Sequence, residues 1–295
     1  MGIRVDIQSL TAFIKVAETG SFSETAKALY LTQSAVSKRI AQLEEQLGKR
    51  LFDRINRQVS LTEAGEALLP YARGILAQLN DGKRAMEQLS NQISGSLSLA
   101  TSHHVGLHIL PPILRQYTQH YPEVELDLHF LDSEAACQAV EDNRIEIAVV
   151  TLPLQAPVQL ITTPLWDDTL HIVVAKDHPL AREAFSPQQL SDYPAILPPR
   201  ATYTRTLVEK ALLPLGVELN TRLASNYLET IKMMVSVGLG WSALPQRMIS
   251  DDLRVLPVPQ FNAHRQLGVV QHHQRTPSNA GSSLLKLLNE SVTGA

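Results

Sequence analysis

Three short amphipathic segments follow one another at the start of the chain, separated by residues that end and begin helices. In the first segment, Leu10, Phe13, Ile14 and Ala17 are spaced as one apolar face, and Gly20 ends the helix. A short helix can bury such a face only against a neighbour. The segments therefore predict a small helical head.

The second and third segments carry their own start signals. Ser21 and Glu24 form a capping box that begins the second helix, and Thr32 is the N-cap of a third helix that ends at Gly48. The inward residues are Phe22, Ala26 and Leu29 in the second helix, and Val36, Ile40, Leu43 and Leu47 in the third.

The face opposite the apolar stripe of the third helix is narrow and polar. Ser34, Ser37, Lys38 and Ala41 share it, with Gln33 at the helix start. Gln pairs with adenine edges, Ser with bases or phosphate, and Lys with guanine or phosphate, so such a face fits the major groove of DNA. A short helix, a turn and a polar helix form the helix-turn-helix layout. A plain three-helix bundle with solvated polar residues is the alternative.

A basic hairpin follows the third helix. Leu51 and Phe52 are apolar anchors, residues 54–58 form a basic turn, and residues 59–61 alternate like a strand. Such a hairpin is a wing that sets arginine against phosphate or the minor groove, which favours a winged helix-turn-helix over the bundle. The candidate DNA contacts are Ser23, Thr32, Gln33, Ser34, Ser37, Lys38, Arg39, Arg54 and Arg57.

Taken together, these residues resemble the LysR-type transcriptional regulators. Thr25 and Tyr30 depart from the family pattern, and neither lies on the proposed DNA face. The resemblance implies a regulator that binds promoter DNA and is not an enzyme. It rests on Leu10, Phe13, Gly20-Ser21-Phe22-Ser23, Thr32-Gln33-Ser34-Ala35-Val36-Ser37, Ile40, Leu43-Glu44, Leu47-Gly48, Leu51-Phe52, Arg54 and Leu61-Thr62-Glu63-Ala64-Gly65.

The charge of the chain is unevenly spread. The 295 residues carry a formal net charge of −3, which by itself argues against a nucleic acid partner. Residues 1–62, however, hold nine Lys and Arg against six acids, a net +3, which leaves −6 for the remainder. This split predicts one surface for a polyanion and another without that need.

Residues 63–92 carry a seam in which apolar or small residues alternate at steps of three and four. Such a seam is typical of a two-chain coiled coil, so we predict a dimerisation helix. An amphipathic helix packed on its own domain is the alternative. Pro70 should kink the helix near its start, and Gly65 and Gly82 weaken the seam. The predicted dimer contacts are Leu68, Ala72, Ile75, Leu79 and Met86.

Residues 93–295 alternate strand and helix signals. The predicted strands are residues 97–100, Val124–Phe130 and Ile145–Val150, and helices around Pro111 and over residues 134–143 separate them. A strand, a helix and a strand with short loops form a right-handed parallel unit, so this region is an α/β domain. The predicted fold is multidomain α and α/β, with a winged helix-turn-helix over 1–62, a linker helix over 63–92 and an effector-binding domain over 93–295.

The family resemblance extends through this second half. It implies a type 2 periplasmic-binding-protein-like domain with an effector between two lobes, and tetramers built from dimers. Lobe I would comprise 93–163 and 268–295 and lobe II 164–267, with crossovers near Thr162–Leu165 and Leu267–Val270. The last helix, about Ser278–Glu290, should return to the first lobe.

Polar residues follow the predicted strands, where parallel sheets bind ligands. Hydroxyls and backbone N–H groups at a helix start suit a carboxylate or a similar anion. A small anionic effector of unknown identity is therefore predicted, although each residue alone could be a helix cap or part of a solvated loop. The candidates are Thr101, Ser102, His103, Asp132, Ser133, Thr151, Thr202 and Asn226.

Two other function classes stay open. An α/β hydrolase-like enzyme would use Ser102, His103 and Asp132, although the chain lacks a nucleophile elbow, a phosphate-binding loop, a zinc-protease motif and a dinucleotide fingerprint. A ligand-independent architectural DNA-binding protein is the other class. In that class the large acidic C-terminal domain would have no function.

Metal, thiol and membrane chemistry find little support. His103-His104 and His272-His273 are adjacent pairs without a helical i, i+4 partner, so we predict no metal site and no resident cofactor. The single cysteine, Cys137, excludes an internal disulfide and is interpreted as a small hydrophobe buried in a helix. Without a membrane-length apolar stretch or a signal pattern at residues 1–6, a cytoplasmic protein is expected.

Overall fold

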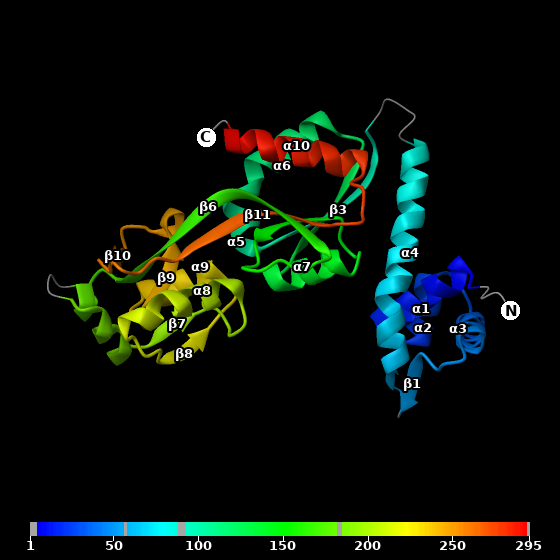
Figure 1. Cartoon of the computed structure of the whole chain (residues 1–295), viewed down its shortest axis with the longest axis horizontal. Helices are drawn as coiled ribbons and strands as arrows, with labels where there is room; N and C mark the ends of the chain where they lie inside the picture. The colour runs from blue at the N-terminus through cyan, green and yellow to red at the C-terminus, as the bar shows by residue number, and fades with distance from the viewer. Residues whose placement is uncertain (1–4, 56–57, 88–92, 182–184, 294–295) are drawn as a thin grey trace. The chain divides into compact units, whose positions relative to one another are not determined.

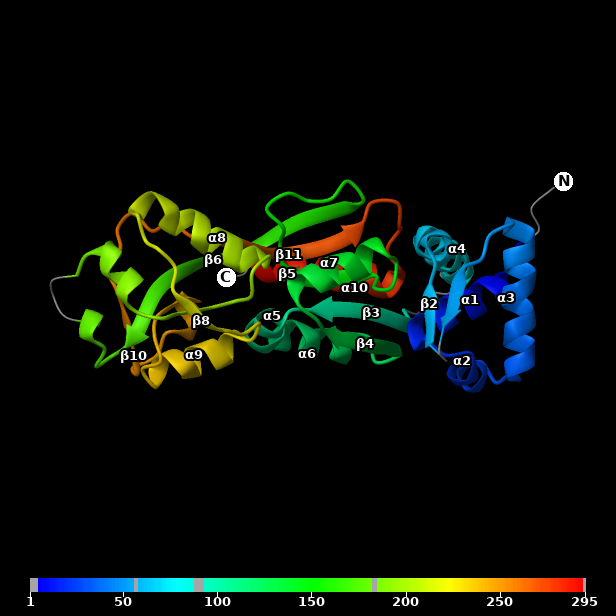
Figure 2. The same cartoon turned by 90° about the horizontal axis from the view of Figure 1, so that it is seen from below.

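The chain folds into two compact units, one made chiefly of residues 1–91 and the other chiefly of residues 92–295 (Figure 1). The computed structural model describes residues 5–55, 58–87, 93–181 and 185–293. The first unit is mainly helical, and the second is built on a mixed sheet with helices on its faces (Figures 1 and 2). None of the described helices combines the length and apolarity that a membrane span needs.

The first unit, called the head below, is a winged helix-turn-helix. The predicted helix ends at Gly20 and Gly48 are confirmed, because both glycines take the left-handed conformation, with φ of 61° and 64°. Phe13, Val36 and Phe52 lie in its core. Its elements are α1 (Ile7–Thr19), α2 (Phe22–Ala28), α3 (Gln33–Leu47), the antiparallel pair β1 (Phe52–Ile55) and β2 (Gln58–Leu61), and α4 (Glu63–Glu87).

Side-chain caps and one buried hydroxyl fix the turn between α1 and α2. The hydroxyl of Ser21 accepts from the backbone N–H of Glu24 at 3.3 Å, as predicted. The Glu24 carboxylate, however, pairs with Nζ of Lys27 at 2.9 Å, so the reciprocal half of the predicted capping box is replaced by an ion pair. Thr25 is fully buried, and its hydroxyl is satisfied by that of Thr19 at 2.8 Å.

The residues of the predicted seam on α4 lie in two different environments. Ala72 is fully buried in the core of the head, which corrects its prediction as a dimer contact, and Leu68 packs half-buried against the same core. Farther along, Ile75 and Leu79 are 48% and 36% exposed. The helix passes through Pro70 and is described to Glu87, while the side chain of Met86 and residues 88–92 lie outside the described part.

In the second unit, parallel strands build a first lobe. Strand β3 lies between β4 and β5 and is parallel to both. Helix α10 packs on this lobe through Leu284 and Leu288, so the predicted return of the last helix is confirmed. The elements of lobe I are β3 (Gly95–Thr101), α5 (His103–His108), α6 (Leu110–His120), β4 (Val124–Phe130), α7 (Ser133–Glu141), β5 (Ile147–Thr151) and α10 (Asn279–Thr293).

The second lobe has its own core around the buried Trp241. Its strands β7 and β8 are parallel, and β9 and β10 add antiparallel to a strand shared with lobe I. The elements are β7 (Ala195–Leu197), α8 (Tyr203–Leu212), β8 (Thr221–Ala224), α9 (Leu228–Ser236), β9 (Ser242–Pro245), β10 (Leu253–Val255) and the short helices η1 (Pro179–Ala181), η2 (Pro187–Asp192), η3 (Leu213–Leu215) and η4 (Gln246–Met248).

Two long antiparallel strands, β6 (Leu160–Ala175) and β11 (His264–His272), run through both lobes. The predicted crossovers lie within them: Gly268 is opposite Pro164, next to a bulge that interrupts the pairing after Leu267. A Cβ at Gly268 would lie 2.2 Å from the carbonyl oxygen of Thr163, so only glycine permits this close approach.

Two features of this unit were not predicted. No helix was predicted over the residues of α5, and β6 was not predicted as one long strand that both lobes share. Cys137 lies in α7, 3% exposed, as predicted, and burial raises the pKa of its thiol to about 11.

The start of α4 offers a test of the head's packing. A Cβ at Gly65 would lie 2.2 Å from the carbonyl oxygen of Leu51, whereas a Cβ at Gly82 meets no described atom within 4 Å. We expect Gly65→Ala to lower the free energy of unfolding by about 1–3 kcal/mol through overpacking. Gly82→Ala should raise it by about 0.5–1 kcal/mol, because alanine favours the helix. Denaturant unfolding followed by circular dichroism measures both, and a stabilising Gly65→Ala would contradict the close contact.

Candidate functional site

The polar side chains predicted to contact DNA lie on one face of α3. Gln33, Ser34 and Lys38 are exposed on it and Ser37 is half-buried. Ser23 on α2 donates from its hydroxyl to Oε1 of Gln33 at 3.1 Å, so it holds the carboxamide in place. Thr32 caps the helix, since its hydroxyl accepts from the backbone N–H of Ala35 at 3.2 Å.

The predicted arginine contacts differ in their surroundings. Arg54 on β1 stacks over Phe22, with its guanidinium carbon 4.1 Å from the ring centroid, so the wing is tied to α2. Arg39 has a partner within the head: its Nη2 donates to Oε1 of Gln8 at 2.7 Å, on the side of α3 that faces α1. Arg57 lies outside the described residues.

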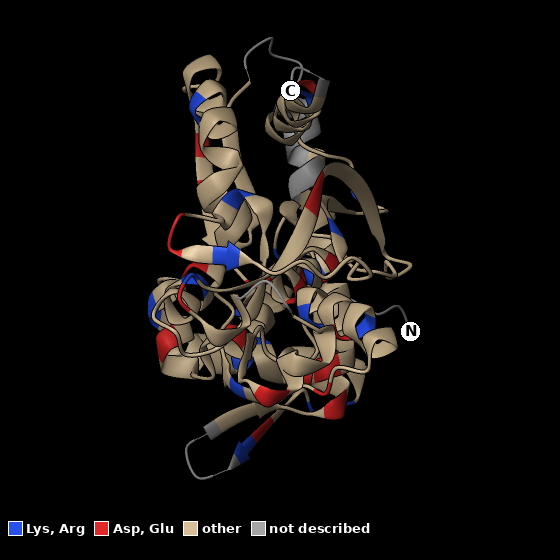
Figure 3. Ribbon diagram, turned by 90° about the vertical axis from the view of Figure 1, so that its left-hand side faces the viewer, with Lys and Arg blue, Asp and Glu red and all other residues tan. Residues whose placement is uncertain are grey.

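Charges of both signs occur on both units, and the β1–β2 hairpin itself carries both (Figure 3). The net +3 of residues 1–62 therefore does not form a uniform basic surface. Attraction of the head to DNA depends on where its few cations lie, on α3 and on the wing.

A pocket lies between the two lobes of the second unit and gathers most of the predicted effector ligands. Seven of the eight candidates line it, all except Thr101. The pocket holds about 460 Å³ of space, part of it open to solvent. Its lining residues are Ser102, His103, His104, Asp132, Ser133, Glu134, Thr151, Pro198, Thr202, Thr204, Asn226, Leu228 and Arg265.

Thr101 has a structural task instead. It is fully buried, and its hydroxyl donates to the carbonyl oxygen of Val149 at 2.9 Å, which ties β3 to β5. This corrects its prediction as a pocket residue. The strand simply ends one residue later than the sequence pattern suggested.

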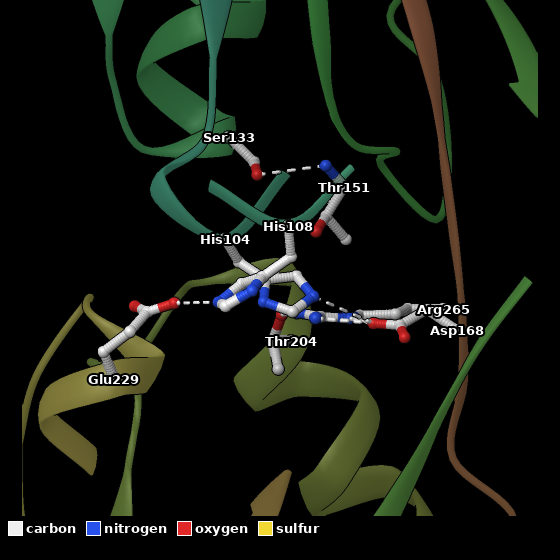
Figure 4. Close-up of polar contacts among 8 residues, drawn as sticks. All are labelled: His104, His108, Ser133, Thr151, Asp168, Thr204, Glu229 and Arg265. Carbon is white, nitrogen blue, oxygen red and sulfur yellow. Dashed lines mark hydrogen bonds and ion pairs between the residues drawn. The ribbon is translucent and has the colours of Figure 1, made fainter. Parts of the chain in front are cut away.

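Arg265 and Thr204 were missed because they come from elements far away in the sequence. Arg265 on β11 and Asp168 on β6 are cross-strand neighbours and are both buried. Nε and Nη2 of Arg265 lie 2.7 and 2.6 Å from Oδ2 of Asp168 (Figure 4). Burial lowers the pKa of Arg265, and the Asp168 carboxylate counteracts this effect. Nη1 donates to the hydroxyl of Thr204 at 3.0 Å.

Two carboxylates of α7 and its preceding loop reach across to the other lobe. Oε1 of Glu134 accepts from the backbone N–H of Tyr203 at 2.5 Å, at the first residue of α8. Oδ2 of Asp132 accepts from Nδ2 of Asn226, also at 2.5 Å. These contacts hold the pocket walls together in this arrangement.

The pocket does not assemble a hydrolase triad. The ring of His103 packs between Phe130 and Tyr227, with centroids 5.7 and 4.9 Å away, and the Asp132 carboxylate is engaged by Asn226. No Ser–His–Asp relay joins Ser102, His103 and Asp132 among the contacts of the described residues.

Family comparison agrees with the geometry of both units. Residues 7–66 match the profile of the bacterial regulatory helix-turn-helix proteins of the lysR family, and residues 90–293 match the LysR substrate binding domain. The chain belongs to the LysR family. It is therefore a DNA-binding transcriptional regulator and not an enzyme.

Known regulators match part or nearly all of the chain. The uncharacterized HTH-type transcriptional regulator YeiE of Escherichia coli (strain K12) is 32% identical over 283 residues, which is 94% of this chain and 95% of YeiE. An uncharacterized HTH-type regulator of Azotobacter vinelandii is 64% identical over 108 residues, 37% of this chain and 75% of that protein.

Solved structures share the fold. A full-length OxyR variant from Pseudomonas aeruginosa has a TM-score of 0.74 at 22% identity, and the match covers 98% of this chain and 95% of that one. Full-length CbnR, solved with its target DNA, has a TM-score of 0.65 at 19% identity, covering 98% and 99%. The two-unit LysR architecture is thus shared along the whole chain.

The division of labour within the head leads to a prediction. Gln33→Ala should cost about 1–3 kcal/mol of discrimination between cognate and altered sites, because it removes a base contact. Arg54→Ala should weaken binding to all sequences and lower the salt slope by about 1, because it removes a phosphate contact. Gel shifts on DNA flanking the gene, at several salt concentrations and with competitor DNA, measure both effects.

Arg39→Ala is the matched control, because Arg39 is bonded to Gln8 on another side of α3. We expect it to change affinity less than Arg54→Ala does. If Gln33→Ala and Arg54→Ala lost specificity equally, the assigned roles would be wrong.

Proposed function

We propose that this LysR-type regulator changes its promoter binding in response to a small organic anion held between the two lobes. One observation carries the proposal: the carboxylate of Glu134 accepts from the N–H of Tyr203 at the start of α8, beside the pocket. The start of a helix with unsatisfied N–H groups is a natural anion site. The carboxylate of an effector would compete with Glu134 for this position.

The hydroxyls around the pocket support an anionic ligand. The hydroxyl of Thr204 accepts from Arg265 at 3.0 Å, and that of Ser133 accepts from the N–H of Thr151 at 3.2 Å. A hydroxyl that accepts one hydrogen bond directs its own proton elsewhere. In the pocket, these protons are available to an anion.

Response to the effector follows from its contacts with both lobes. An effector changes an equilibrium only if it binds one arrangement better than the other. Displacement of Glu134 would break its contact with Tyr203 of the other lobe and replace it with contacts to the ligand. Because β6 and β11 join the lobes, a change in the relative position of the two lobes is transmitted along both strands.

We further propose that the regulator acts as a homodimer, assembled into tetramers, on promoter DNA in the cytoplasm. Ile75 and Leu79 lie one turn apart on α4 and expose apolar surface beyond the part of the helix that the head covers. Two such helices can bury these residues against each other. A two-fold dimer then reads two half-sites of a palindrome.

The effector proposal is tested by thermal shift. Acetate, succinate, citrate, sulfate and phosphate are added to the full chain, and an anion at about 100 times its Kd should raise Tm by roughly 5–10 °C. Glu134→Gln should enlarge the shift, because it removes the competing carboxylate. Asp132→Asn, at the carboxylate that contacts Asn226, is the control and should enlarge it less.

Absence of any shift in the wild type and in Glu134→Gln would overturn the anionic effector. A regulator whose Tm and gel shift respond to no small molecule would match the architectural alternative.

Dimerisation through α4 is tested by Leu79→Asp. The buried charge should raise the dimer dissociation constant at least about tenfold, because an unpaired charge is costly in an apolar interface. Ala67→Asp places the same charge on an exposed position outside the seam and should change it little. Sedimentation equilibrium measures both, and an unchanged dimer in Leu79→Asp argues for another interface.

A further inference from the structure

Helix α5 brings two histidines onto one face. His104 and His108 are four residues apart on this helix, with ring centroids 5.1 Å apart, so the i, i+4 partner that was not recognised in the sequence is present. Glu229, in the first turn of α9 in the other lobe, has its Oε1 2.8 Å from Nε2 of His108 (Figure 4). One potential ligand atom from each of the three residues lies within 4.8 Å of the others.

His104 is a buried potential metal ligand, and its ring nitrogens make no hydrogen bond among the described residues. The residue is 5% exposed, and neither Nδ1 nor Nε2 has a hydrogen-bond partner there. Burial in the first place, and then the positive charge of Arg265, lower its pKa to about 3. The imidazole is therefore neutral, the form that binds metal ions.

Glu229 supplies the negative charge of the cluster. Burial would raise its pKa, but its own backbone N–H and the contact with His108 outweigh this effect, so the pKa is lowered. Its second oxygen, Oε2, is buried without a hydrogen-bond partner in the described structure. An ionised carboxylate oxygen with no donor is unusual in a protein interior and is suited to a cation.

We propose that His104, His108 and Glu229 form a binding site for a divalent transition-metal ion, with Zn²⁺ as the expected ion, that bridges the two lobes. Two imidazoles and a carboxylate suit Zn²⁺, whereas Mg²⁺ and Ca²⁺ prefer oxygen ligands. Tetrahedral zinc with bonds of about 2.0–2.1 Å needs ligand atoms about 3.4 Å apart. When the ion binds, Nε2 of His108 and Oε1 of Glu229, now 2.8 Å apart, therefore separate slightly, and the ring of His104 moves toward the ion.

Asp168 completes the surroundings of the site. Its Oδ2 lies 3.9 Å from Nε2 of His104, so we place the metal ion on the other ring nitrogen, Nδ1. A metal-bound histidine usually offers its other ring N–H to a carboxylate. The Arg265–Asp168 pair would thus support the metal site as well as the pocket.

A metal ion here ties α5 of lobe I to α9 of lobe II. His104 also lines the pocket, so the ion would bind at the wall of the cleft and favour the arrangement in which the lobes are close. This site does not depend on the anionic effector, because its ligands do not include Glu134 or the pocket hydroxyls.

Titration of the full-length protein with Zn²⁺ alone, followed by calorimetry without DNA or organic anions, tests the proposal. We expect one ion per chain to bind at this site and Co²⁺ to give the visible spectrum of a tetrahedral site. His108→Gln and Glu229→Gln should each weaken Zn²⁺ binding at least about 100-fold. Loss of an outer-shell partner already weakens metal binding by up to about 100-fold, and loss of a direct ligand should cost at least as much. Both side chains are partly exposed, at 38% and 33%, so these variants should fold.

His120→Gln, an exposed histidine at the end of α6, is the matched control and should bind Zn²⁺ as the wild type does. Circular dichroism verifies that each variant is folded. Failure of the wild type to bind Zn²⁺, or equal binding by all three variants and the wild type, overturns the proposal. A negative anion screen leaves these outcomes unchanged, so the two proposals fail separately.

Discussion

The buried ion pair between Arg265 and Asp168 is the interaction on which the effector domain depends. It joins β11 and β6 a few residues beyond the point where these strands pass from lobe I into lobe II. It also orients Thr204 and lies beside His104. Removing one partner of such a pair costs about 3–5 kcal/mol, because the other charge stays buried without compensation. A hydrophobic pair could replace its stabilising effect, but it could neither donate to Thr204 nor face His104.

Several of the contacts between the lobes are made by polar side chains. Glu134 and Asp132 reach N–H groups of the opposite lobe, and His108 reaches Glu229. Each partner can also be satisfied by water or by a ligand, so exchange costs little net free energy. The two lobes have separate apolar cores, one around Trp241 and one around β3, and β6 and β11 connect the lobes.

In the head, backbone caps and close packing determine how α4 is attached to the helix-turn-helix. Its glycine caps, the close approach at Gly65 and the burial of Leu68 and Ala72 fix the start of α4 rigidly to the helix-turn-helix. The geometry of the reading helix is therefore coupled to the direction of α4. Exposed Ile75 and Leu79 continue from this rigid base, so pairing of two α4 helices would set the separation of two reading helices.

The sequence by itself determined what is local. Glycine caps, apolar stripes and alternation predicted the helix-turn-helix, the wing and the parallel strands of lobe I. The rule that ligands bind beyond parallel strands found the pocket residues Ser102, His103, Asp132, Ser133 and Thr151. Only the tertiary structure decided which distant residues meet. Arg265, Thr204 and Glu229 come from three separate elements, and no local pattern relates them. Helix α5 is six residues long, too short to show periodicity, so the spacing of His104 and His108 had no meaning until their backbone was seen to be helical.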